Sequence, residues 1–137
     1  MSTTYTRTIT LESDPSSAEE AVRAALLEQG FGILSTIDVQ ATLREKLDHH
    51  MDTYRILGAC NPGLAKRAIE IDPDIGAMLP CNVLLRANPN GGTDVVAADP
   101  LAMLSVGAED LTDVAHEARA GIDAALGSLA AGGDGTD

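Results

Sequence analysis

Residues 54–62 read YRILGACNP and residues 79–83 read LPCNV, and these two stretches say most about the fold. The first has the apolar, β-rich composition of a strand up to its cysteine. Its Asn-Pro pair then predicts a helix start, because asparagine caps a helix and proline presets the first turn. The run 81–87 (CNVLLRA) predicts another strand. Cys60 therefore ends one strand and Cys81 begins another, and the two thiols would meet if these strands were antiparallel neighbours.

Outwards from these stretches, strand-like and helix-like segments alternate. The expected strands are Thr4–Leu11, Phe31–Ile37, Thr53–Cys60, Cys81–Ala87 and Thr93–Ala98. Such alternation is compatible with a parallel α/β sheet. However, the helices after the second and third strands are short, and the turn NPNGG at 88–92 predicts a hairpin. The sequence therefore predicts an α+β fold with a mixed or antiparallel sheet of about five strands and helices on one face.

Two boundaries of the first helix can be placed from local signals. Ser16 with Glu19, and Ser17 with Glu20, each fit a capping box, in which a hydroxyl and a carboxylate satisfy free N–H groups. Gly30 is well placed to end the helix in a left-handed conformation. We therefore expect the helix to begin at one of the two serines.

The next two elements are expected to contribute to the core. The run 31–37 is short and apolar, which predicts a buried strand. Asp38 can cap the helix that follows, whose inner face would consist of Val39, Leu43 and Leu47.

The last helix has the clearest periodicity in the chain. Its apolar stripe consists of Leu111, Ala115, Ala118, Ile122, Ala125 and Leu129. Such a stripe must pack against another element. Residues 131–137 are rich in Gly and Asp and predict a flexible acidic tail, so we expect a single domain over residues 1–130.

The charge of the chain limits its partners. Asp and Glu number 21 against 9 Lys and Arg, which gives a formal charge of −12. An acidic surface repels phosphate backbones and anionic lipids, so neither a nucleic acid nor a membrane is expected as a partner. Adaptation to a high-salt host and ordinary acidity from a GC-rich genome explain this composition equally well.

A cytoplasmic location is expected. The first ten residues lack the apolar stretch of a signal peptide, and no apolar run approaches the length of a membrane span. Two cysteines in 137 residues do not suggest a secreted disulfide scaffold.

The two cysteines are the main candidates for chemistry. Cys60 lies directly before a capped helix start, where the helix dipole favours a thiolate. A pair of thiols in contact with Cys81 could form a reversible disulfide or bind a soft metal. Their spacing contains no CxxC motif and fits no zinc pattern. Two buried cysteines that act as small apolar residues are the alternative.

Other polar residues lie beside the cysteines or on the same strands. The candidate ligand-binding residues, besides Cys60 and Cys81, are Asn61, Asn82, Tyr54 and Arg55. Asn61 also has a plain role as a helix cap, and Asn82 should face away from the Cys81 thiol. Arg55 and Arg86 could share an anion, or each could pair with a carboxylate.

The histidines are weaker candidates. His49 and His50 stand beside aspartates and could bind a divalent metal, but an exposed polar loop explains them as well. His116 falls beside the apolar stripe of the last helix, as a surface or interface residue would.

Several of these segments together resemble one family. They are GFGIL at 30–34, IDV at 37–39, ATL at 41–43, YRILGACNP at 54–62, LPCNV at 79–83, and Asp99–Pro100 near Met103. Over about residues 16–130 the chain resembles the family known as domain of unknown function 302. The resemblance implies a curved antiparallel sheet similar to that of TATA-binding-protein-like folds, and a homodimer. It implies no activity.

Three kinds of function remain open from the sequence. The first is a protein that binds or senses a small ligand or soft metal through the two cysteines. The second is a redox or transfer enzyme with Cys60 as nucleophile, for which no histidine spacing supplies the general base. The third is a structural or interaction protein with inert cysteines. The sequence does not decide whether the chain is an enzyme, and it names no cofactor.

Overall fold

The computed structural model describes residues 5–132 and has the predicted α+β class. The strands are β1 (Thr6–Leu11), β2 (Gly32–Asp38), β3 (Tyr54–Cys60), β4 (Cys81–Ala87) and β5 (Thr93–Ala98). The helices are α1 (Pro15–Glu28), α2 (Val39–Leu47), α3 (Pro62–Ile71), α4 (Pro100–Leu104) and α5 (Thr112–Gly132), with short 3-10 helices η1 (Pro73–Met78) and η2 (Glu109–Leu111). The predicted strands all form; Thr4, the predicted start of the first, lies outside the described residues, and the other ends differ by at most one or two residues.

The sheet is antiparallel throughout, in the order β1-β5-β4-β3-β2. The hairpin of β4 and β5 accounts for one pair, and β3 lies on the other side of β4. In the β3–β4 register, Ala59 stands opposite Cys81. The segments GACNP and LPCNV therefore lie side by side at one end of the sheet.

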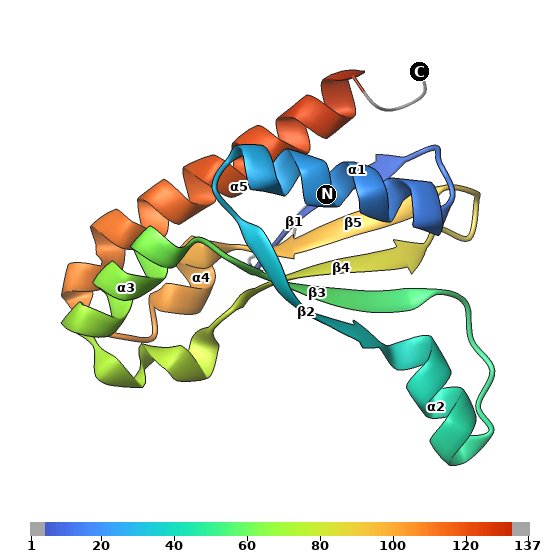
Figure 1. Ribbon diagram of the computed structural model, residues 1–137, viewed down its shortest axis with the longest axis horizontal. Helices are drawn as coiled ribbons and strands as arrows, with labels where there is room; N and C mark the ends of the chain where they lie inside the picture. Colours follow the sequence, from blue (N-terminus) through green and yellow to red (C-terminus); the bar gives the residue numbers. More distant parts are fainter. Residues whose placement is uncertain (1–4, 133–137) are drawn as a thin grey trace.

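Two long helices, α1 and α5, lie on the same face of the sheet, and within residues 5–132 no helix packs flat against the opposite face (Figure 1). The predicted stripe of α5 is buried along its whole length, from Leu111 at 1 % exposure to Leu129 at 6 %. From Ala118 onward the stripe packs with α1 and the inward residues of β3, β4 and β5 into the main core. The helix continues to Gly132, into the expected tail, of which residues 133–137 lie outside the described range.

A second, smaller core lies at one end of the sheet. It is formed by α3, η1, α4, η2 and the first turns of α5. Its buried residues are Ala68, Ile75, Leu104, Leu111, Val114 and Ala115. The two cores meet near the cysteine ends of β3 and β4.

The single phenylalanine packs against a glycine of α5. Phe31 is 2 % exposed, and its ring carbon Cε1 lies 2.8 Å from the place where a side-chain carbon on Gly121 would be. We expect Gly121→Ala to lower the free energy of unfolding by about 1 kcal/mol, because displacing a buried ring costs more than the gain in helix propensity. Gly127→Ala on the same helix meets nothing within 4 Å and should gain about 0.5–1 kcal/mol. Urea unfolding of both variants measures this, and equal gains would show that the ring does not press on the helix.

The start of α1 differs from the prediction. The helix begins at Pro15, and the carboxylate of Asp14 accepts a hydrogen bond of 2.8 Å from the Ser17 N–H. This bond holds the pKa of Asp14 below its ordinary value. Neither serine caps the helix, because a proline at the first helical position has no N–H to satisfy and its ring already fixes the helical φ.

The predicted burial of β2 and α2 is wrong. Leu34 and Leu47 are each 71 % exposed, and α2 has no buried residue. The cause is sheet order: β2 is an edge strand with a bulge between Ile33 and Ser35, and α2 extends past that edge (Figure 1). An edge strand has only one neighbour to cover it.

Candidate two-cysteine site

Cys60 and Cys81 come from adjacent strands and line one cavity. Cys60 is the last residue of β3 and Cys81 the first of β4. Because Ala59 pairs with Cys81, the two cysteines are offset by a single position across the ladder. Both are free thiols and both are half-buried.

Asn61 shapes the turn that follows Cys60. Its side-chain oxygen accepts a hydrogen bond of 3.2 Å from the Leu64 N–H, which caps α3 as the sequence predicted. Its Nδ2 lies 3.0 Å from where a side-chain carbon on Gly30 would be. Gly30 has a φ of +87° and ends α1 as predicted, so a single glycine both stops the helix and leaves room for the cap.

The cavity itself is small and almost wholly apolar. It offers about 30 Å³ to the centre of a water-sized sphere. Its lining consists of Ala59, Cys60, Asn61, Leu64, Ala65, Ala68, Leu79, Cys81, Leu104, Val114 and Ala118. A single water needs roughly 10–15 Å³ in this measure, and organic ligands occupy pockets of about 300–1,000 Å³. The cavity therefore suits one atom or ion and excludes an organic metabolite.

The electrostatics of the cavity keep Cys81 protonated. Burial, with a smaller effect from the neighbouring Cys60 thiol, raises the pKa of Cys81 to about 11. At neutral pH this group is a neutral thiol, and it must lose a proton before it can act as a strong metal ligand.

Among residues 5–132, no cluster of three or more His, Cys, Asp or Glu side chains could hold a metal. His49 and His50 are exposed after α2, where His50 Nε2 lies 3.3 Å from a carboxylate oxygen of Asp48. His116 is exposed on α5. None of the three lines the cysteine cavity, so it contains no general base of the kind a thiolate enzyme uses.

Tyr54, Arg55 and Asn82 do not join the cysteines. Tyr54 and Arg55 begin β3, about 16–20 Å along the strand from Cys60. Asn82 is exposed and points to the opposite face from Cys81, as predicted.

The two arginines face opposite sides of the sheet. Tyr54 pairs with Arg86, so Arg55 is on the face covered by α1 and Arg86 is on the uncovered face. Arg86 lies 3.4 Å from Asp94. The arginines therefore pair with carboxylates and do not share an anion.

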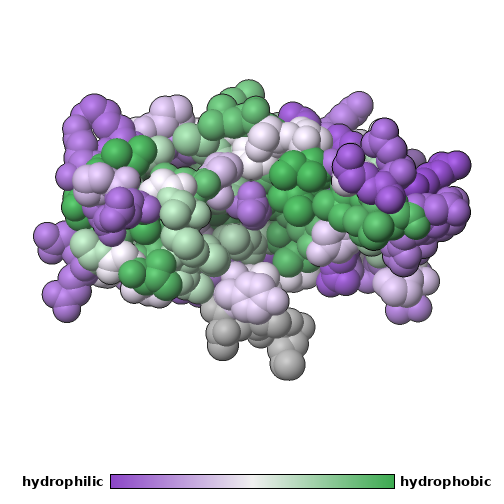
Figure 2. All heavy atoms as spheres, turned by 90° about the horizontal axis from the view of Figure 1, so that it is seen from below, coloured by the Kyte–Doolittle hydropathy of each residue, from purple (hydrophilic) through white to green (hydrophobic). Residues whose placement is uncertain are grey.

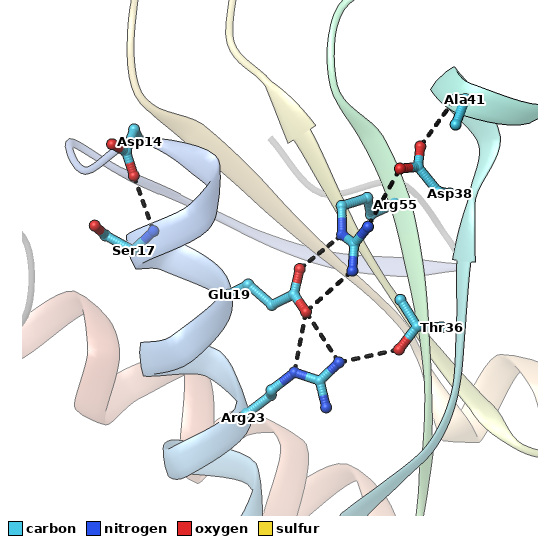
Figure 3. Close-up of polar contacts among 8 residues, drawn as sticks. All are labelled: Asp14, Ser17, Glu19, Arg23, Thr36, Asp38, Ala41 and Arg55. Atoms are coloured by element: carbon cyan, nitrogen blue, oxygen red, sulfur yellow. Dashed lines mark hydrogen bonds and ion pairs between the residues drawn. The ribbon is translucent and has the colours of Figure 1, made fainter. Parts of the chain in front are cut away.

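Arg55 belongs to an ion-pair cluster that the sequence did not reveal (Figure 3). Its Nε donates to Glu19 at 2.7 Å and its Nη1 to Asp38 at 3.3 Å. Arg23 reaches the same Glu19 carboxylate and donates to the Thr36 hydroxyl at 3.0 Å. The hydrogen bond from Arg55, more than that from Arg23, lowers the pKa of Glu19. The cluster joins α1 to β2 and β3, and only the Glu19–Arg23 spacing of four gave a local signal.

Fold and site define a small α+β protein with helices on one face of its sheet and a small apolar cavity, lined in part by two cysteines, at one end of its central strands. The chain belongs to the family described as domain of unknown function DUF302, whose family model matches residues 7–129. Among curated proteins, none matches this sequence. No helix in the described part of the chain is long and apolar enough to cross a membrane.

A solved structure shares the fold. The crystal structure of an uncharacterized conserved DUF302 protein from Bacillus stearothermophilus superposes with a TM-score of 0.81. It is 24 % identical in sequence, and the match covers 91 % of this chain and 98 % of that one. The similarity supports the fold assignment.

Proposed function

We propose that this protein binds a single soft metal ion, with Cu(I) as the best fit, between the thiolates of Cys60 and Cys81. The observation that carries the proposal is that both cysteines are among the residues that line the same small apolar cavity. A protein that holds one such ion can serve as a sensor or a carrier of it.

The donor set favours a soft ion of low coordination number. Structural zinc takes four ligands, and calcium and magnesium take six or more oxygens. Cu(I) is selected by thiolates and accepts two of them in a linear arrangement. The apolar lining supports the same choice, because few groups in it compete with sulfur for the ion.

Charge balance also supports a monovalent ion. Two thiolates with Cu⁺ carry a net charge of −1. The ten-residue helix α3 begins at Pro62, two residues after Cys60. The partial positive charge of its N-terminus would stabilise a single negative charge there.

Reduced protein should bind one equivalent of Cu(I), and Cys60→Ser or Cys81→Ser should weaken binding by at least about 100-fold. Mutation of residues that only hold the metal ligands in place lowers metal affinity by roughly 10–100-fold. Loss of one of the two ligands themselves should lower the affinity by no less. Anaerobic titration against a Cu(I) chelator of known affinity measures this.

The matched controls separate binding from folding. Circular dichroism must show that both serine variants fold, and Asn82→Ala, which alters an exposed residue beside Cys81, should bind like the wild type. Failure of the folded wild type to bind Cu(I), or wild-type affinity in both serine variants, would rule out the site and leave the cysteines as packing residues.

A further inference from the structure

An open polar cleft lies at the end of the molecule where α2 extends past the sheet. Figure 2 shows apolar side chains across the middle of the sheet face opposite α1 and α5, and hydrophilic ones gathered at the two ends. The cleft lies between the first half of α1, the start of α2 and the start of β3. It offers about 450 Å³ to the centre of a water-sized sphere, within the range of about 300–1,000 Å³ that organic ligands occupy. Unlike the cysteine cavity, it has room for a small organic molecule.

The charged side chains that line this cleft cancel one another. They are Glu19, Glu20 and Arg23 from α1 and Arg55 from β3, two of each sign on a chain with a net charge of −12. A simple anion would meet the two glutamates, and a simple cation would meet the two arginines. A ligand that carries both charges can place each of them beside an opposite charge.

Glu20 is the carboxylate that is left for a ligand. Arg23 has a glutamate both three and four positions before it, and it binds Glu19, the more distant of the two in sequence (Figure 3). Arg55 binds the same Glu19 carboxylate, with its Nε at 2.7 Å. Glu20 is exposed, and no group within residues 5–132 forms a hydrogen bond or an ion pair with its carboxylate. A ligand ammonium can therefore bind Glu20 without breaking a contact of the fold.

The two arginines keep N–H groups free for a ligand carboxylate. A guanidinium has five N–H donors, and Arg55 uses three of them, two on Glu19 and one on Asp38. Arg23 uses its Nε and Nη2, and its Nη1 donates to no group in the described part of the chain (Figure 3). Because Glu19 holds both side chains in place, they lose little rotamer freedom when a carboxylate binds.

The remaining lining groups suit an uncharged polar side chain on the ligand. Gln40 Nε2 donates to the Met51 carbonyl at 2.8 Å, which leaves the Oε1 of Gln40 able to accept. Ser16 and Thr53 add hydroxyl groups that have no hydrogen-bond partner among residues 5–132. A ligand hydroxyl or amide can pair with these groups, whereas an aliphatic side chain would displace water from them and give nothing in return.

The spacing of the free groups matches an α-amino acid. Glu20 and Arg23 are three positions apart on α1, so their Cβ atoms lie about 5–6 Å apart on one face of the helix. In an α-amino acid the ammonium and the carboxylate are attached to one carbon, so a single molecule can contact both side chains. We propose that this cleft binds a free α-amino acid with an uncharged polar side chain, its ammonium at Glu20 and its carboxylate at Arg23 and Arg55. The proposal is independent of the copper site, because no residue lines both.

Isothermal titration calorimetry of the reduced, metal-free, full-length chain tests the proposal. At least one of L-serine, L-asparagine and L-glutamine should bind with a Kd below about 1 mM, and L-leucine should bind at least about tenfold more weakly. The N-acetyl and the carboxamide derivatives of the best ligand each lack one of its two charges. Each should bind at least about tenfold more weakly than the parent amino acid.

Variants of α1 locate the ligand. Glu20→Gln should weaken binding at least about tenfold and leave folding intact, because the Glu20 carboxylate pairs with no group of the described chain. Glu28→Gln removes an exposed carboxylate of the same helix outside the cleft, and it should leave the affinity unchanged. Arg23→Gln should weaken binding as Glu20→Gln does, once circular dichroism shows that it folds. If it does not fold, Glu20→Gln decides.

Four results would overturn the proposal. The first is that none of the three polar amino acids binds. The second is that the N-acetyl or the carboxamide derivative binds as tightly as its parent, since one charge would then suffice. The third is equal affinity for L-leucine, and the fourth is wild-type affinity in folded Glu20→Gln.

Discussion

The affinity for Cu(I) should rise at least about tenfold for each pH unit between roughly pH 6 and pH 9. Burial raises the pKa of Cys81 to about 11, so this thiol is protonated throughout that range. Cu(I) must displace the proton from the Cys81 sulfur. As the pH rises, the proton concentration falls, and protons compete less with Cu(I) for this ligand. The gain continues until the pH approaches about 11 and ends above it. Competition titrations at a series of pH values, corrected for the protonation of the chelator, measure the slope.

The serine variant at this position gives the matched test. In Cys81→Ser the residual affinity should depend on pH less steeply than in the wild type, by one proton. An affinity that does not change with pH would contradict binding through a protonated thiol. Thiolate absorbance in the ultraviolet, followed in the metal-free protein, checks the pKa of Cys81 independently.

The sequence could predict the elements whose signals are local. The turn at 88–92 fixes the hairpin of β4 and β5, and Asn61 with Pro62 fixes the start of α3. The stripe of α5 fixes its buried side because six positions agree on one face. In each case a few neighbouring residues determine the geometry.

Burial at the sheet edge could not be predicted in the same way. Leu34 and Leu47 are as apolar as core residues, but their exposure depends on β2 having a neighbour on one side alone. That depends on strand order, which no local pattern encodes. The same holds for Arg55 and Arg86, whose opposite faces follow from register.

The candidate site was predictable in part. Its two thiols follow from the strand ends at Cys60 and Cys81 once β3 and β4 are antiparallel neighbours. The cavity is a different matter, since Leu104 and Val114 reach it from segments beyond β5. Its volume comes from how two cores meet, and that is a property of tertiary packing.

Gly92→Ala should lower the free energy of unfolding by about 3 kcal/mol, a large part of the total for a domain of this size. Gly92 has a φ of +83°, which costs a side-chain-bearing residue about 1–2 kcal/mol. A side-chain carbon there would also collide with the carbonyl oxygen of Leu11. Relief of the collision must move the end of β1 away from Thr93, its partner on β5, whose hydroxyl also donates to the Ser13 carbonyl.

Gly91 isolates the collision from the backbone effect. It has a φ of +104°, and a side-chain carbon there meets nothing within 4 Å. Gly91→Ala should therefore cost only about 1–2 kcal/mol, and the loss of unfolded-state entropy is the same in both variants and cancels between them. Urea unfolding followed by circular dichroism gives both values. Equal losses would mean that β1 is not held tightly against the turn, and the sheet edge at β1 would then be looser than its pairing with β5 indicates.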